Sequence, residues 1–228
     1  MPPRLSVIPI VGEVTDPTPW LHLVSTLDVI INVLGRVPDM RTFFNTLLSS
    51  ISTAAKDLRL SSAPRLTYIY TSGTWVHGEN RKDIVTDTTP CTNPIKFAAW
   101  RLDQEQLVVT DPNLNGIVIR PSLLYGRSGS LFAPLFKSAS EGNKVAWYGT
   151  PGGQYALIHA DDLADLYVRA SEKAAIAGGK IFDAANDMTE SVDGFLEKLM
   201  EVSGNKGGYE YIQPTNCEPL SLLLLLFL

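Results

Sequence analysis

Short apolar runs alternate along this chain with longer stretches in which apolar residues recur every three or four positions. Four runs predict buried strands, at residues 7–11, 27–34, 66–70 and 116–119. Residues 27–34 (LDVIINVL) are largely apolar at consecutive positions, which is typical of strands covered on both faces of a parallel sheet. The three-to-four-residue spacing predicts helices over residues 39–60, 94–109, 161–170 and 191–202.

The ends of these predicted helices carry residues suited to their positions. Asp161 and Asp162 favour a helix N-terminus because its N–H groups and dipole attract negative charge. Ser191 is suited to cap the last helix and Gly204 to end it, and Glu105 is predicted on the outer face of the helix over 94–109. The alternation of strand and helix predicts an α/β fold with right-handed βαβ units and a doubly wound parallel sheet.

The composition is that of an ordinary globular domain: 228 residues, 45% hydrophobic and 19% charged. A formal net charge of −5 argues against a nucleic-acid partner. Two cysteines, Cys91 and Cys217, are too few for a disulfide framework or a zinc site, so we expect no metal and a cytoplasmic location. The leucine-rich stretch 220–228 is shorter than the roughly 20 residues of a membrane span, and no membrane is expected.

Five segments carry a resemblance to a known family. They are residues 28–35 (DVIINVLG), 68–78 (YIYTSGTWVHG), 120–126 (RPSLLYG), 159–164 (HADDLA) and 181–186 (IFDAAN). In this order they resemble the fourth, fifth and sixth strands and two substrate-lobe segments of the extended short-chain dehydrogenase/reductases, the NAD-dependent epimerase/dehydratase relatives. The resemblance implies a Rossmann-like, NAD(P)-binding fold with a small C-terminal substrate lobe, an NAD or NADP cofactor and a small-molecule substrate.

The chain departs from the family pattern at its start. The family's first strand runs into a G-x-x-G-x-x-G loop whose N–H groups hold the pyrophosphate, and no such motif occurs in this sequence. Residues 7–16 (VIPIVGEVTD) instead resemble the third strand and its turn, with Glu13 where the family places an adenine-contacting Asp. We therefore expect a truncated domain over residues 1–215, a partial sheet without the first two strands, and a leucine-rich tail over 216–228.

The catalytic positions are altered as well. The family's proton-donating Tyr and its Lys partner align with Phe97 and Arg101, and the catalytic Ser aligns with Gly73. Phe97 has no hydroxyl, and the Arg101 guanidinium can hold a ribose or carbonyl oxygen but cannot shuttle protons. The resemblance thus gives as catalytic positions Ser72, Thr74, Phe97 and Arg101, and as cofactor-binding positions Glu13, Gly35, Arg101, Pro121 and Tyr125.

Some of these residues also have a purely structural interpretation. Arg101 is alternatively a solvated surface charge, and Ser72 and Thr74 are alternatively turn residues that bond their own backbone. His159 is interpreted as an ordinary, partly buried histidine and His77 as an exposed loop residue. Tyr125 is predicted to lie in a loop after Pro121 and to line a pocket.

Two hypotheses about function follow. The first is an NAD(P)-dependent oxidoreductase or epimerase-like enzyme for a small carbonyl-bearing or sugar-derived substrate, with little activity and weak cofactor binding because the glycine loop is absent. The second is a non-catalytic fragment that serves as an interaction module or is merely a truncated product. A sheet without its first two strands leaves residues 27–34 as an open edge, which predicts self-association through strand pairing.

Overall fold

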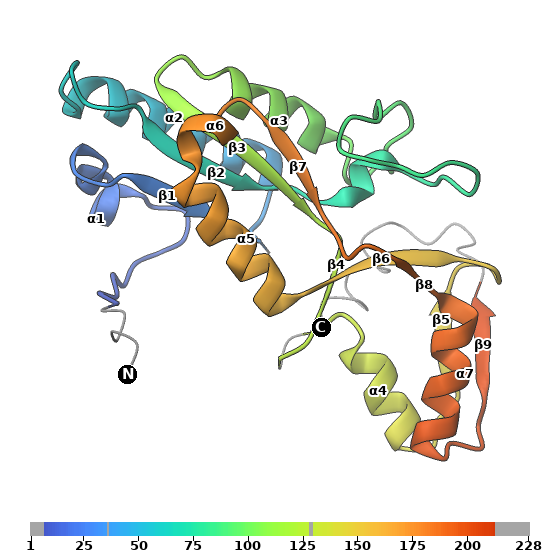
Figure 1. The fold of residues 1–228 in the computed structure, drawn as a ribbon. Coiled ribbons are helices and arrows are strands. Elements are labelled where there is room, and N and C mark those ends of the chain that lie inside the picture. The colour runs from blue at the N-terminus through green and yellow to red at the C-terminus, as the bar shows by residue number, and fades with distance from the viewer. Residues whose placement is uncertain (1–6, 36, 128–129, 213–228) are drawn as a thin grey trace. The chain divides into compact units, whose positions relative to one another are not determined.

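A computed structural model of the chain describes residues 7–35, 37–127 and 130–212 (Figure 1). The chain divides into two compact units, and each unit consists of three separate segments. The first unit contains Met1–Thr71, Trp100–Val118 and Ala170–Ile181, and the second contains Ser72–Ala99, Ile119–Arg169 and Phe182–Leu228. The predicted tail over 216–228 and Cys217 lie outside the described residues.

The helices, 3-10 helices (η) and strands follow one another in an irregular α/β order. They are α1 (Thr18–Leu21), η1 (His22–Ser25), β1 (Val29–Asn32), α2 (Met40–Leu58), β2 (Leu66–Thr71), η2 (Thr74–His77), α3 (Trp100–Thr110), β3 (Leu114–Pro121), β4 (Leu123–Tyr125), α4 (Ala133–Ser140), β5 (Val145–Tyr148), β6 (Gln154–His159), α5 (Ala160–Glu172), α6 (Ala174–Ala177), β7 (Ile181–Ala184), β8 (Thr189–Ser191), α7 (Val192–Ser203) and β9 (Tyr209–Ile212).

Four strands form the main sheet in the order β1-β2-β3-β7. β1 and β2 run parallel, with Ile30 opposite Tyr68. The strands predicted at 27–34, 66–70 and 116–119 are confirmed as β1, β2 and β3. The assignment of residues 181–186 to a strand of the substrate lobe is wrong, because β7 joins the main sheet beside β3, where the Val118 N–H donates to the Lys180 carbonyl.

The core of the first unit lies between α2, α3 and the strands β2 and β3, as Figure 1 shows. The predicted apolar spacing of the 39–60 helix is confirmed at Leu47, Leu48, Ile51 and Ala55, which are buried, whereas Phe43 is only half-buried and Leu58 is 49% exposed. Residues 66–70 of β2 are all buried, although successive side chains point to opposite faces. Both faces of this strand are therefore covered, as its apolar sequence predicted.

The predicted strand at residues 7–11 is wrong. This segment has no strand hydrogen bonds, and Val7, Ile8 and Val11 are exposed. The chain instead turns at Glu13, whose carbonyl accepts from the Asp16 N–H at 3.1 Å, and the Asp16 carboxylate accepts from the Thr18 N–H at 2.9 Å at the start of α1. A strand needs a neighbour for its backbone groups, and the sheet described here offers this segment none.

The helix predicted over 94–109 begins later, and Glu105 does not lie on its outer face. Residues 96–99 form a separate turn, in which Ile95 O accepts from Ala98 and Ala99, and α3 starts at Trp100. Glu105 is fully buried, whereas Leu107 is about half exposed. The predicted face was wrong because the buried side of α3 is not its apolar side, which its weak amphipathic pattern did not reveal.

The second unit holds a smaller lobe of short strands and two helices. β4, β6 and β8 form one sheet and β5 and β9 another, and α4 and α7 pack against the second through Ala139, Val145 and Leu196. The caps predicted for the last helix are confirmed: the Ser191 hydroxyl accepts from the Gly194 N–H, and Gly204 ends α7 in the left-handed conformation. In the described ranges no helix is both long and apolar enough to cross a membrane.

The free edge of β1 leads to a prediction. β1 lies at the end of the main sheet, and Ile31 on this strand is 41% exposed. An apolar edge strand is a template for pairing with another chain, and a charged side chain there opposes it. We expect the chain to self-associate in a concentration-dependent way and Ile31→Lys to reduce this clearly, measured by size-exclusion chromatography with light scattering. Ile176→Lys, at an exposed position on α6, is the control; a monodisperse unmutated monomer would contradict the prediction.

Candidate functional site

Arg101 lies at the carboxyl end of β2 in the first unit. Its Nη1 donates to the Tyr70 hydroxyl at 3.1 Å and to the Thr71 carbonyl at 3.3 Å, and its Cζ lies 4.8 Å from the ring centroid of Trp100. The side chain is half-buried. Arg101 is thus held against the strand end by two hydrogen bonds and a cation–π contact, and it does not extend freely into solvent.

Tyr70 fixes the position of Arg101 but is not suited to donate a proton. Burial raises the pKa of Tyr70 to about 12, although the nearby Arg101 charge opposes this shift. The side chain is fully buried, and its ring packs edge-on against Phe44 at 5.5 Å. Tyr70 therefore stays protonated at neutral pH and serves as an anchor for the guanidinium.

A second buried polar pair lies at the end of β1, and sequence reasoning did not identify it. The Asn32 side-chain amide donates to the Tyr68 hydroxyl at 2.7 Å, and its oxygen accepts from the Leu34 N–H at 3.1 Å. Burial raises the pKa of Tyr68. This pair shapes the backbone that leads to Gly35, which is exposed and has open space where a side chain would be.

Glu13 borders a small cleft of the first unit, about 180 Å³ in volume. Its lining is mostly apolar and consists of Ile10, Gly12, Glu13, Val14, Asp16, Pro19, Trp20, Leu34 and Leu47. A typical small-molecule site measures roughly 300–1,000 Å³. The cleft is therefore large enough only for part of a ligand, and Glu13 and Asp16 are both exposed carboxylates in its lining.

The predicted hydroxyl residues belong to the second unit. Ser72 follows β2 and is buried, and its N–H donates to the Ile119 carbonyl at 2.8 Å. Thr74 begins η2 and is half-buried, with the extended Gly73 before it. Phe97 is half-buried in the turn before α3. The sequence predicted Phe97 and Arg101 on one helix over 94–109, and this is wrong because α3 begins at Trp100.

Tyr125 is a strand residue and not a loop residue, because β4 pairs in parallel with β6 and places Tyr125 opposite His159. The two rings meet edge-on at 5.1 Å, and the Tyr125 hydroxyl accepts from the Asn186 amide at 3.4 Å. Tyr125 does border a cleft, of about 660 Å³, as predicted; its other lining residues include Asp162, Arg169 and Asn186. Pro121 ends β3 and is half-buried.

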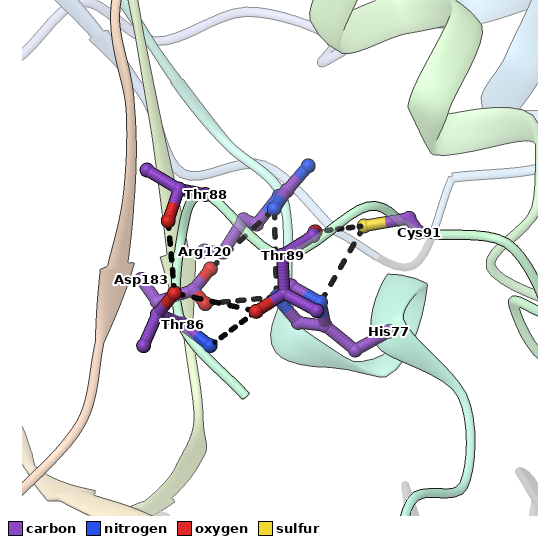
Figure 2. A network of polar contacts seen from close by, with 7 residues as sticks. All are labelled: His77, Thr86, Thr88, Thr89, Cys91, Arg120 and Asp183. Carbon is purple, nitrogen blue, oxygen red and sulfur yellow. Dashed lines mark hydrogen bonds and ion pairs between the residues drawn. The ribbon is translucent and has the colours of Figure 1, made fainter. Parts of the chain in front are cut away.

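The prediction that His77 is exposed is wrong. Its side chain is only 7% exposed, and Nε2 lies 2.8 Å from the Asp183 carboxylate. Figure 2 labels both residues within one network of polar contacts. Arg120 Nη1 approaches the same carboxylate to 3.6 Å. The sequence does contain an indication of this buried ion pair, since two apolar strands each carry a charged residue, Arg120 in β3 and Asp183 in β7. Their pairing was not predicted, because it depends on β7 lying beside β3 in the main sheet.

The N-terminus of α2 is not suited to bind a phosphate group. The helix that follows β1 begins with the Asp39 carboxylate as its N-cap, and this carboxylate accepts from the Thr42 N–H at 3.3 Å. That hydrogen bond lowers the pKa of Asp39, so the cap is negatively charged at neutral pH. A negative cap repels phosphate and occupies a donor that phosphate would need. In the same ranges, no group of three or more His, Cys, Asp or Glu residues is arranged to hold a metal ion.

Residues 7–185 match the model of the NAD dependent epimerase/dehydratase family. This match covers most of the chain, and the chain therefore belongs to that family. The Rossmann-type α/β fold and the strand order described above agree with this membership.

Among curated proteins, the chain is similar to a 4-hydroxy-2-methyl-3-oxo-4-farnesyl-3,4-dihydroquinoline-1-oxide ketoreductase of Stigmatella aurantiaca, with 22% identity over 162 residues. The alignment covers 69% of this chain and 46% of that protein, so the chain spans about half the length of this curated relative.

Two solved structures have the same fold. The dTDP-glucose 4,6-dehydratase of Bacillus anthracis, in complex with NAD, has a TM-score of 0.73 and 17% identity over 90% of this chain and 67% of its own. The UDP-glucuronic acid 4-epimerase of Bacillus cereus, also in complex with NAD, has a TM-score of 0.67 and 18% identity, and the match covers 84% of this chain and 65% of that protein.

Proposed function

We propose that the chain forms the nicotinamide and substrate side of an NAD(P)-dependent oxidoreductase or epimerase-like protein. The observation that supports this most is the position of Arg101, bonded to the carbonyl that ends β2. Ligand sites of parallel sheets lie beyond the carboxyl ends of the strands. Ser72 and Thr74 follow that carbonyl in sequence and belong to the second unit.

The chemistry of these side chains suggests their roles. Arg101 would donate to an oxygen of the ribose or of a substrate carbonyl, and Ser72 or Thr74 would donate a further hydrogen bond. Phe97 supplies no proton where the family has its Tyr, and the loss of a positioned general acid lowers rates by about 10²–10⁴. We therefore propose a slow enzyme.

The relatives suggest the class of substrate. The similar solved proteins are a dTDP-glucose dehydratase and a UDP-glucuronic acid epimerase, and the curated relative is a ketoreductase. Two of these proteins are named for a sugar nucleotide and the third for the reduction of a ketone. We propose a small molecule of this kind, sugar-derived or ketone-bearing, as the substrate.

A second candidate is a non-catalytic interaction module. The negative Asp39 cap and the absence of a glycine loop favour it for these 228 residues taken alone. The free edge of β1 would then be the surface that contacts another chain.

Activity measurements distinguish the two candidates. The longest natural protein that contains these residues is assayed with dTDP-glucose and UDP-glucuronic acid in the presence of NAD. It is also assayed with a panel of ketones in the presence of NADPH. Turnover is measured by nicotinamide absorbance and by mass spectrometry of the products. Slow, cofactor-dependent turnover supports the enzyme. A folded protein with neither turnover nor cofactor binding contradicts it and supports the interaction module.

Substitutions at Arg101 test its proposed role in that active protein. A hydrogen bond from a charged group contributes about 1.5–3 kcal/mol, so Arg101→Ala should lower kcat/KM by roughly 10–150-fold. Arg101→Lys keeps the charge and should lose less. Arg41→Ala is the control, because Arg41 is exposed on α2 and pairs with Asp103 at the surface. Unchanged kinetics in Arg101→Ala, with an unchanged melting temperature, would exclude Arg101 from the site.

A further inference from the structure

A cysteine, a histidine and an aspartate form a connected cluster in the second unit (Figure 2). Asp183 Oδ2 lies 2.8 Å from His77 Nε2, and Cys91 Sγ lies 3.5 Å from His77 Nδ1. His77 is almost completely buried, whereas Cys91 is half-buried. The two ring nitrogens of one histidine therefore contact a carboxylate on one side and a thiol on the other.

These contacts determine which nitrogen of His77 carries the proton. A carboxylate oxygen only accepts hydrogen bonds, so the contact to Asp183 at 2.8 Å favours the proton on Nε2 over the longer contact from Arg120 Nη1 at 3.5 Å, which would need this nitrogen as an acceptor. In the neutral ring Nδ1 then has its lone pair free to accept, and this is the nitrogen that faces the Cys91 thiol. The arrangement orients His77 as a base for the thiol, with Asp183 as the group that holds the base.

The Asp183 carboxylate favours the charge-separated form of the Cys91–His77 pair, in which the thiol proton has moved to His77. If the thiol proton moves to Nδ1, a thiolate faces an imidazolium, and Asp183 lies behind that imidazolium. Arg120 Nη1 is 3.5 Å from His77 Nε2 and 3.6 Å from Asp183 Oδ1, so this permanent cation offsets part of the stabilisation that Asp183 gives to the imidazolium. Positive groups near a cysteine favour its thiolate, which is the nucleophilic form.

A close approach of two backbone segments brings Cys91 to His77. Gly78 follows His77 with a φ of +71°, and a Cβ on Gly78 would lie 1.9 Å from the Asn93 carbonyl oxygen. Only glycine allows this contact, because any other residue would force the segment of residues 91–93 away. The chain geometry itself therefore holds the thiol beside the histidine.

We propose that Cys91 is a nucleophilic thiol, with His77 as its proton acceptor and Asp183 as a positioning residue, and that it undergoes thiol–disulfide exchange with low-molecular-weight disulfides. The Cys91 sulfur attacks one sulfur of R–S–S–R, a new S–S bond forms, and the old one breaks. The leaving thiolate takes the bonding electrons and receives the proton from His77. Cys91 and one RS group of the disulfide form the mixed disulfide, and the other RS group leaves as the thiol R–SH. The step needs no dinucleotide.

The test measures the alkylation of Cys91 in a Cys217→Ser chain, which leaves one cysteine. An ordinary thiol is only a few per cent thiolate at neutral pH, so full ionisation increases its rate up to about 30-fold. We expect folded Cys91 to react with iodoacetamide at least about tenfold faster than the same chain in urea. Oxidised glutathione should add one glutathionyl group, removable by dithiothreitol, as seen by mass spectrometry.

Three variants separate proton transfer from structure. His77→Asn keeps a hydrogen-bond acceptor near the thiol but is not a base, so the rate should fall to about that of the unfolded chain and rise with pH as for an ordinary thiol. Asp183→Asn should lower the rate partially. Thr88→Val is the control, because Thr88 bonds Thr86 in the same region and does not contact His77.

Two results would overturn the proposal. One is a folded rate no higher than the urea rate, and the other is a His77→Asn rate equal to that of the unmutated chain. If His77→Asn does not fold, the pH profile of the unmutated chain decides: a rate already close to its plateau at neutral pH supports the proposal, and an ordinary thiol profile contradicts it. Fast alkylation without a glutathione adduct would overturn the exchange reaction.

Discussion

This chain is expected to bind NADH and NADPH only in the millimolar range. The pyrophosphate carries the fixed charge of the cofactor, and in this fold it is bound by N–H groups of a glycine loop that the sequence lacks. Charge-assisted hydrogen bonds contribute about 1.5–3 kcal/mol each, so losing two or three of them removes roughly 5 kcal/mol. That loss corresponds to a decrease of about 10³–10⁴ in affinity.

Calorimetry and quenching of tryptophan fluorescence measure this binding on the folded chain. Trp20 borders the cleft beside Glu13 and reports on the adenine end. The dTDP-glucose 4,6-dehydratase, which binds NAD, serves as the positive control. Saturable binding at low micromolar cofactor would mean that another segment of this chain holds the phosphates.

Gly116→Ala is expected to destabilise the chain by about 3 kcal/mol or more, at the upper end of the overpacking range. A Cβ on Gly116 would lie 1.9 Å from the carbonyl oxygen of Val108, so β3 and α3 would have to move apart. Because the obstacle is backbone, no change of rotamer relieves it. In a protein of this size the melting temperature should fall by roughly 6–12 °C.

Gly35→Ala is the matched control for that prediction. Nothing lies within 4 Å of a Cβ at Gly35, so the melting temperature of the Gly35→Ala variant should stay close to that of the unmutated chain. Thermal unfolding followed by circular dichroism compares the two variants. An unchanged melting temperature in Gly116→Ala would show that α3 is not packed as tightly on β3 as described.

Helices and strands that are determined by their own and neighbouring residues were predicted well from the sequence. The strands β1 to β3, the helix α2 and the caps of α7 follow from runs, periodicity and end residues that neighbouring positions supply. Residues 7–11 have the same apolar pattern as a strand, yet they form none. A strand also requires a partner for its backbone, and the presence of a partner is not a local property.

Residues of the candidate site could be predicted only at positions that match the family's sequence motifs. The spacing to the altered Tyr and Lys positions identified Arg101, but nothing local indicated that Tyr70 and Thr71 hold it. His77 and Asp183 are 106 positions apart, and only the fold brings them together. Glu105 looked like a surface residue because charged residues are rarely buried, so composition favoured the wrong face.

The interleaving of the two units has a consequence for how the chain can be divided. The chain passes between the units after residues 71, 99, 118, 169 and 181, so no contiguous fragment contains either unit without part of the other. Contacts within each unit join segments far apart in sequence, which slows folding. During synthesis the first unit lacks its last segment, Ala170–Ile181, until three quarters of the chain has been made. Neither unit can therefore be excised as an autonomous domain by a single pair of cuts.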